Sequence, residues 1–160
     1  MNPSIYRWVI AWSGLALCAA FILVLTMWPT PIDRGYESSI DRVLQLLHNR
    51  GVPDWFGYRK FEFAANMVMF VPFGFFTVLS LPKNKWWIAV FLIPLFSVSI
   101  ETAQKMFLSQ RFSSVFDVIA NFVGGYLGIG AAVFIWSLVW SRDRHLLKKH
   151  DLEQTHTLPN

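Results

Sequence analysis

Polar side chains recur at helical spacing, three or four residues apart, within otherwise apolar stretches of this chain. They comprise three carboxylates and three amides: Glu62, Asn66, Glu101, Gln104, Asp117 and Asn121, and Arg111 stands just before the last of these stretches. Residues at this spacing share one face of an α-helix. Carboxylates in such a cluster could act as general acid and base, and the arginine could hold a phosphate group. The pattern therefore predicts a polar ligand site, provided that the stretches meet in space.

The composition indicates that these stretches lie in a membrane. Hydrophobic residues make up 54% of the 160 residues and charged residues only 15%, against about 25% charged residues in soluble domains. Four apolar stretches, at about 8–29, 62–81, 86–108 and 116–140, reach the roughly 20 residues that cross a bilayer. Tryptophans near their ends suit the membrane interface. The sequence predicts an all-α membrane protein with four transmembrane helices in residues 1–140 and a polar tail at 141–160.

The loop at 30–60 is predicted to contain a short interfacial helix. In the segment ESSIDRVLQLLHNRG, Ser38 or Ser39 could cap the start of the helix and Gly51 could end it. Its apolar residues recur at helical spacing on one face, namely Ile40, Val43, Leu44 and Leu47. Such a helix could lie on the outer membrane surface. Alternatively, it could pack over the mouth of the bundle.

The distribution of basic residues bears on partners and topology. They lie in loops beside the predicted spans rather than on one soluble face, so nucleic-acid binding is not expected. The dense basic loop at 83–85 and the basic tail after residue 141 favour both termini in the cytoplasm. We therefore expect a multi-pass protein of the cytoplasmic membrane. The second and fourth spans start on the side of the membrane where the third span ends. The polar residues would therefore gather at the outer face of the membrane.

Small residues on the fourth span predict close helix packing. Ala120, Gly124, Gly128 and Ala132 follow one another at four-residue spacing, on the face that also carries Asp117. Small residues let helices approach closely in lipid. The stripe could serve packing within the bundle or assembly of a homo-oligomer. In the structural interpretation, the amides only join helices and Asp117 complements a helix N-terminus capped by Ser113 or Ser114.

Two segments resemble the VanZ-like family of small bacterial membrane proteins. They are NMVMFVPFGFF at 66–76 and SVSIETAQKMFLSQRFSSVFDVIANFVGGYLG at 97–128. The resemblance marks these motif positions: Asn66, Phe70, Pro72, Gly74, Glu101, Gln104, Arg111, Asp117, Asn121 and Gly124. We assign Gly74 to helix packing. The family is named for a protein that lowers susceptibility to teicoplanin-type glycopeptides, so the resemblance implies a role in the cell envelope.

Three classes of function are compatible with these patterns. The favoured one is a non-enzymatic protein that binds a lipid-linked cell-wall precursor, a lipophilic glycopeptide or another membrane lipid at the outer leaflet. The second is an intramembrane lipid-modifying enzyme, with Glu101 and Asp117 as acid and base and Arg111 as phosphate clamp. The third is an oligomeric transporter. The four histidines lie outside the predicted spans, and no residue spacing matches a known type of metal site, so no metal or other cofactor is expected. A cation held by the carboxylates is the alternative.

Overall fold

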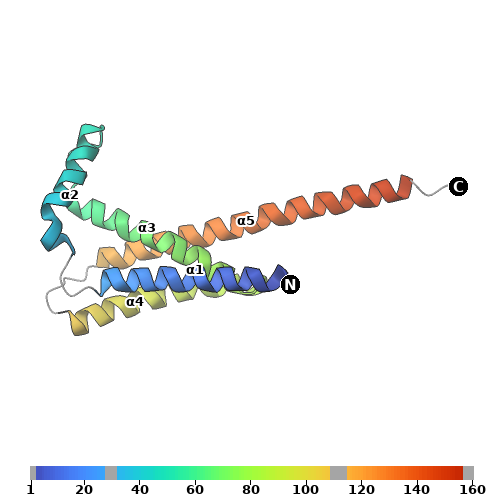
Figure 1. Cartoon of the computed structure of the whole chain (residues 1–160), viewed down its shortest axis with the longest axis horizontal. Coiled ribbons are helices and arrows are strands. Elements are labelled where there is room, and N and C mark those ends of the chain that lie inside the picture. The colour runs from blue at the N-terminus through green and yellow to red at the C-terminus, as the bar shows by residue number, and fades with distance from the viewer. Residues whose placement is uncertain (1–2, 28–31, 109–114, 157–160) are drawn as a thin grey trace.

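The chain is built from helices (Figure 1). The computed structural model describes residues 3–27, 32–108 and 115–156, with the side chains of 5–27, 41–108 and 115–142. The elements in order are α1 (Pro3–Thr26), α2 (Ile32–Asn49), α3 (Tyr58–Leu79), the 3-10 helix η1 (Lys83–Ile88), α4 (Ala89–Phe107) and α5 (Val115–His156).

Four helical segments in the described part are long and apolar enough to cross a membrane. They are Ile5–Thr26, Tyr58–Leu79, Lys83–Phe107 and Val115–Arg142. Helices suit this setting because all their central backbone groups are hydrogen-bonded within the segment, where no water is present to replace those bonds. The predicted architecture, an all-α membrane protein with four spans and a short helix in the first loop, is confirmed.

Several boundaries differ from the predicted spans, among them the start of α3 at Tyr58 rather than residue 62. The third span begins as the 3-10 helix η1, directly after Pro82, whose ring fixes φ and removes a backbone donor. The fourth helix continues through the polar residues beyond 140 as far as His156. At about 1.5 Å per residue its 42 residues span about 60 Å. Its C-terminal part therefore projects past the other helices, as Figure 1 shows.

The core of the bundle lies around α3, which contacts α1, α4 and α5. Phe70 is fully buried and Phe73 nearly so. Phe73 stacks on Phe96 of α4, with 4.4 Å between ring centroids. Ile22 of α1 and Ile93 of α4 belong to the same buried cluster. The α3 helix is therefore the element against which the other spans are placed.

Glycines form a seam between α3 and α5, where the two backbones touch. A Cβ atom added to Gly74 would overlap the backbone of Gly125, and one added to Gly124 would overlap the carbonyl of Met67. A Cβ atom on Gly128 would likewise overlap the backbone of α3. Ala120 and Ala132, the other members of the predicted small-residue stripe, are fully buried. The glycines of the stripe, Gly124 and Gly128, thus pack against α3 of the same chain.

The α2 helix stands apart from the spans. It begins at Ile32, earlier than the segment predicted from residue 37, and the chain turns after it at Gly51, whose φ of +96° favours glycine. Leu44 is buried, whereas Val43 is exposed. Figure 1 shows α2 projecting to one side at the end of the bundle. In the described chain it packs closely against no spanning helix, which favours a surface position over one that covers the bundle mouth.

Candidate functional site

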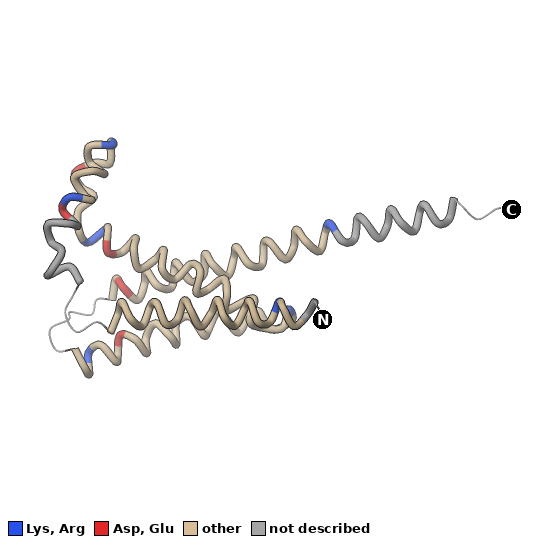
Figure 2. Tube along the Cα trace, viewed as in Figure 1, with Lys and Arg blue, Asp and Glu red and all other residues tan. Residues whose placement is uncertain are grey.

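One end of the bundle collects the acidic residues of the spans. The α1 and α4 helices end there, and α3 and α5 begin there. Figure 2 shows the acidic positions of the spans at this end, opposite the two termini. A charged group in hydrocarbon is costly and normally faces protein or water. The topology therefore brings polar residues of separate spans to one membrane face.

Two side-chain hydrogen bonds tie the start of α5 to its neighbours. The Asn66 Nδ2 atom on α3 donates to Asp117 Oδ1 at 3.0 Å. One turn further along α5, Asn121 Nδ2 donates to Ser97 Oγ on α4, also at 3.0 Å. Asn121 is buried, and its Oδ1 atom has no hydrogen-bond partner among the described residues. Interhelical bonds of this kind contribute about 0.6 kcal/mol on average.

A third bond joins α4 to the end of α1. Gln104 Nε2 donates to the backbone oxygen of Thr26 at 2.8 Å. The last carbonyls of a helix lack partners within it, so Gln104 supplies one of the missing donors. Glu101, one turn before on the same helix, is only 7% exposed. Gln104 and Asn121 therefore act as connections between helices, as the structural interpretation predicts for amides.

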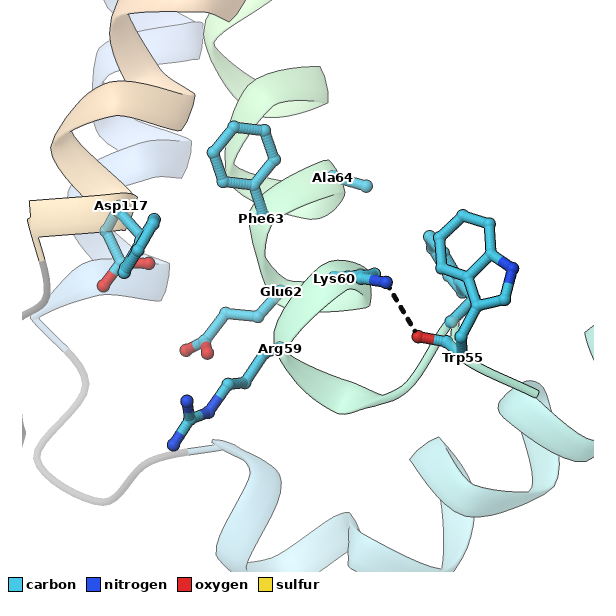
Figure 3. Close-up of a pocket in the computed structure, with 9 residues that line it drawn as sticks. Trp55, Arg59, Lys60, Glu62, Phe63, Ala64 and Asp117 are labelled. Atoms are coloured by element: carbon cyan, nitrogen blue, oxygen red, sulfur yellow. Dashed lines mark hydrogen bonds between the residues drawn. The ribbon is translucent and has the colours of Figure 1, made fainter. Parts of the chain in front are cut away.

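A pocket opens at the same end, between the starts of α3 and α5. Its volume is about 720 Å³, within the 300–1,000 Å³ typical of small-molecule sites. It is lined by Trp55, Phe56, Arg59, Lys60, Glu62, Phe63, Ala64, Phe116 and Asp117 (Figure 3). Aromatic rings and an alanine supply its apolar wall. Two basic and two acidic side chains supply its polar part.

The predicted site residues separate into two groups. Glu62 and Asp117 line the pocket, and Asn66, which does not line it, donates a hydrogen bond to Asp117. Other predicted residues, Glu101, Gln104 and Asn121, are buried between helices and do not line the pocket. Arg111, the predicted phosphate clamp, lies outside the described residues, as do the proposed caps Ser113 and Ser114.

The basic side chains of the pocket lie on different sides of α3. Lys60 Nζ donates to the backbone oxygen of Trp55 at 2.9 Å and lies 3.7 Å from the centroid of its ring. A cation over the face of tryptophan is attracted by the negative charge of that face. Figure 3 shows Arg59 and Glu62 extending the other way, toward the side of the pocket where Asp117 lies.

Comparison with known proteins agrees with the sequence motifs. The family model described as VanZ/LLP1 matches residues 14–137. The chain belongs to the VanZ/LLP1 family. Comparison with curated proteins and with solved structures gives no match. The match covers all four spanning segments in whole or in part, together with the pocket between α3 and α5.

For this VanZ/LLP1 family member, sequence reasoning missed most of the residues that line the pocket. The missed residues are Trp55, Phe56, Arg59, Lys60, Phe63, Ala64 and Phe116. Aromatic and basic residues at the start of a span are typical of any membrane interface. That signal places them at the membrane surface, but it does not show that they surround a cavity.

No metal centre is evident in the described part of the chain, where no group of three histidine, cysteine or acidic side chains could hold an ion. The pocket presents carboxylates, a guanidinium, an ammonium group and aromatic rings instead. Such a lining can bind an amphipathic molecule, with ion pairs to its head and apolar contacts to its body.

Proposed function

We propose that this VanZ/LLP1 family member binds the head of a membrane lipid, or of a lipid-linked or lipophilic ligand, in the pocket between α3 and α5. The supporting observation is the pocket itself, which combines an apolar wall with four charged side chains at one end of a transmembrane bundle. Phe63 and Phe116 would contact the apolar body of the ligand. Arg59 would bind a phosphate group.

The proposed site faces the outer leaflet of the cytoplasmic membrane, with both termini in the cytoplasm. The basis is the basic loop around Lys83 and Lys85, at the opposite end from the pocket. Single cysteines in a Cys18→Ala background test this orientation. An impermeant maleimide applied to intact cells should label Asp54→Cys and spare Asn84→Cys. The opposite labelling would place the pocket at the inner leaflet and would remove an extracellular ligand from the proposal.

The binding proposal is tested by identifying the lipids that purify with the protein. Mass spectrometry should find a lipid species enriched over the detergent extract in the wild type and depleted in Arg59→Gln. Lys83→Gln is a matched control, because Lys83 is exposed at the opposite end of the bundle. Identical lipid profiles for all three proteins, each matching the bulk extract, would contradict the proposal.

A role in the cell envelope is the physiological part of the proposal. Its support is membership of a family named for a teicoplanin-resistance protein, together with a pocket suited to a lipid-linked cell-wall precursor or a lipophilic glycopeptide. Deletion of the gene should change susceptibility to teicoplanin-type glycopeptides. When each variant is expressed in the deletion strain at matched protein levels, Asp117→Asn should restore the original susceptibility less well than Lys83→Gln. Equal restoration by both variants would separate the pocket from this phenotype.

Lipid modification is a second candidate, favoured by the presence of two carboxylates in the pocket. Glu62 and Asp117 could serve as base and acid, with Asn66 orienting Asp117 through the bond of 3.0 Å. Glu101, the acid–base residue expected from the sequence, does not line the pocket. Glu62 therefore takes its role in this enzyme hypothesis. An enzyme should convert a retained lipid during incubation, and Asp117→Asn should still bind that lipid but leave it unchanged. Unaltered lipid after incubation with the wild type would favour binding alone.

A further inference from the structure

Two of the residues that line the pocket lie outside any helix. Trp55 and Phe56 belong to the wall segment, residues 52–57, which joins α2 to α3. Their rings meet edge to face, with 6.5 Å between the centroids. Residues within a helix are fixed by its hydrogen bonds, whereas a connecting segment needs other contacts to keep its shape. The contacts of the wall segment therefore decide how firmly this side of the pocket is held.

The wall segment begins at a tight turn that closes α2. The Val52 N–H group donates to the Leu47 oxygen at 3.1 Å, and the Gly51 N–H group donates to the His48 oxygen at 3.0 Å. This pair of bonds, with a glycine at positive φ, is a common ending of α-helices. The turn brings the wall segment back beside the last turn of α2.

Side chains from both neighbouring helices hold the backbone of the wall segment. From α2, the His48 Nε2 atom donates to the Phe56 oxygen at 3.1 Å. A carbonyl oxygen can only accept, so this nitrogen carries the proton. From α3, the Lys60 Nζ atom donates to the Trp55 oxygen at 2.9 Å (Figure 3). Adjacent carbonyl groups of one short segment are thus bound from two different helices.

The two bonds differ in how well water can compete with them. Lys60 and Trp55 are both exposed, so water can replace the bond between them. The bond from His48 to Phe56 is partly buried. A hydrogen bond shielded from water is electrostatically stronger than one at the surface. Loss of the His48 donor should therefore disturb the wall segment more than loss of the Lys60 donor.

We propose that His48 is a positioning residue, which holds the side of the pocket formed by Trp55 and Phe56 in the place that ligand binding requires. In the described chain α2 packs closely against no spanning helix, yet His48 bonds it to a residue that lines the pocket. This inference rests on the proposed function, because the pocket must bind a ligand. It goes beyond that function by giving a role to α2, none of whose described side chains lines the pocket.

The first test measures binding of dioctanoyl phosphatidic acid to the full-length protein in detergent, by isothermal titration calorimetry. This probe supplies a phosphate group and an apolar body, the two parts that the proposed function requires. His48→Phe keeps a ring but lacks the donor, and should raise the dissociation constant about three- to tenfold, the range expected for loss of one hydrogen bond. His48→Gln places an amide N–H group near the position of Nε2 and should bind nearly as well as the wild type.

Two further variants separate failure of the inference from failure of the proposed function. Gln45→Phe is the matched control and should bind like the wild type, because Gln45 is exposed on the same helix and does not contact the wall segment by a hydrogen bond. Arg59→Gln should weaken binding, since Arg59 is proposed to hold the phosphate. If Arg59→Gln weakens binding and His48→Phe does not, the inference alone is overturned. Absence of binding by the wild type would remove the proposed function and the inference together.

A second measurement follows the wall segment directly. A nitroxide attached at Asp54→Cys, in a Cys18→Ala background, reports motion of the segment by electron paramagnetic resonance. The label should be more mobile in His48→Phe and regain the wild-type mobility in His48→Gln, whereas a label at Asn84→Cys should not change. If His48→Phe melts below the wild type, His48→Asn, whose amide is too short to reach the carbonyl, takes its place. Equal mobility at position 54 with and without the His48 donor would overturn the inference, whatever the calorimetry shows.

Discussion

The helices α3 and α5 meet in two regions that differ in almost every physical respect. Along the seam, Gly74, Gly124 and Gly128 let one backbone rest directly on the other. Near the start of each helix, no glycine holds the two backbones together. Phe63 of α3 and Phe116 of α5 line a pocket of about 720 Å³ there. The same pair of helices is therefore closed in one region and open in the other.

The difference shows how a small bundle can build a site without a separate domain. Small residues lock the helix pair where they cross, so the ends can diverge without loss of the fold. Figure 1 shows α3 and α5 crossing and separating toward the end that carries the pocket. We therefore assign stability to the seam, whereas ligand binding at the open end is the function that we propose.

The largest expected effect on stability comes from filling the seam. Gly128→Leu should destabilise the protein by about 3 kcal/mol or more, because overpacking a well-packed contact typically costs 1–3 kcal/mol. Here the added atoms meet the backbone at Val71, which cannot turn aside as a side chain can. Thermal unfolding in mild detergent measures the change.

Gly130→Leu is the matched control for the seam. It lies on the same helix two residues away, and an added Cβ atom there would meet nothing within 4 Å. It should therefore unfold close to the wild type. Equal stability of the Gly128 and Gly130 variants would show that the contact between α3 and α5 is not close in the protein.

An intermediate effect is expected for the polar contact between α4 and α5. Ser97→Ala removes the partner of Asn121 Nδ2, and should lower the free energy of unfolding by about 1 kcal/mol, near the upper range for interhelical bonds. Ser99→Ala is the control, because the Ser99 hydroxyl binds the backbone of its own helix and is exposed. If both variants lose the same stability, the buried bond contributes nothing specific.

The smallest effect on stability is expected in the pocket. Arg59→Gln should change the free energy of unfolding by no more than about 0.5 kcal/mol, as is usual for exposed positions, because Arg59 is exposed. The same variant should nevertheless lose the lipid that purifies with the wild type. If Arg59→Gln lowers the free energy of unfolding as much as Gly128→Leu does, the division between seam and pocket would be contradicted.

The sequence predicted the seam better than the pocket, for physical reasons. Four-residue spacing placed Gly124 and Gly128 on one face, and helical geometry alone fixes that relation. It did not reveal that Gly125 faces Ile93 of α4, because the partner of a second face depends on tertiary packing. The continuation of α5 to His156 was likewise missed, since polar residues at the end of a span do not distinguish a helix from a loop.

The pocket could not be predicted from the sequence, because a cavity depends on the angle between two helices. Glu62 and Asp117 were predicted from their spacing and line it. The contact between Gln104 and the carbonyl of Thr26 was not predicted, because a terminal backbone oxygen has no signature in the residue type. Asn121 and Glu101 share the polar end but are buried between helices.

The most direct test of the central claim fills the pocket without changing its charges. Ala64→Trp places a large ring in the lining, while Ala20→Trp places the same ring on an exposed position of α1 as control. Both proteins should melt like the wild type. Mass spectrometry should find the enriched lipid retained by Ala20→Trp and lost from Ala64→Trp, whereas undiminished retention by Ala64→Trp would show that the lipid does not bind between α3 and α5.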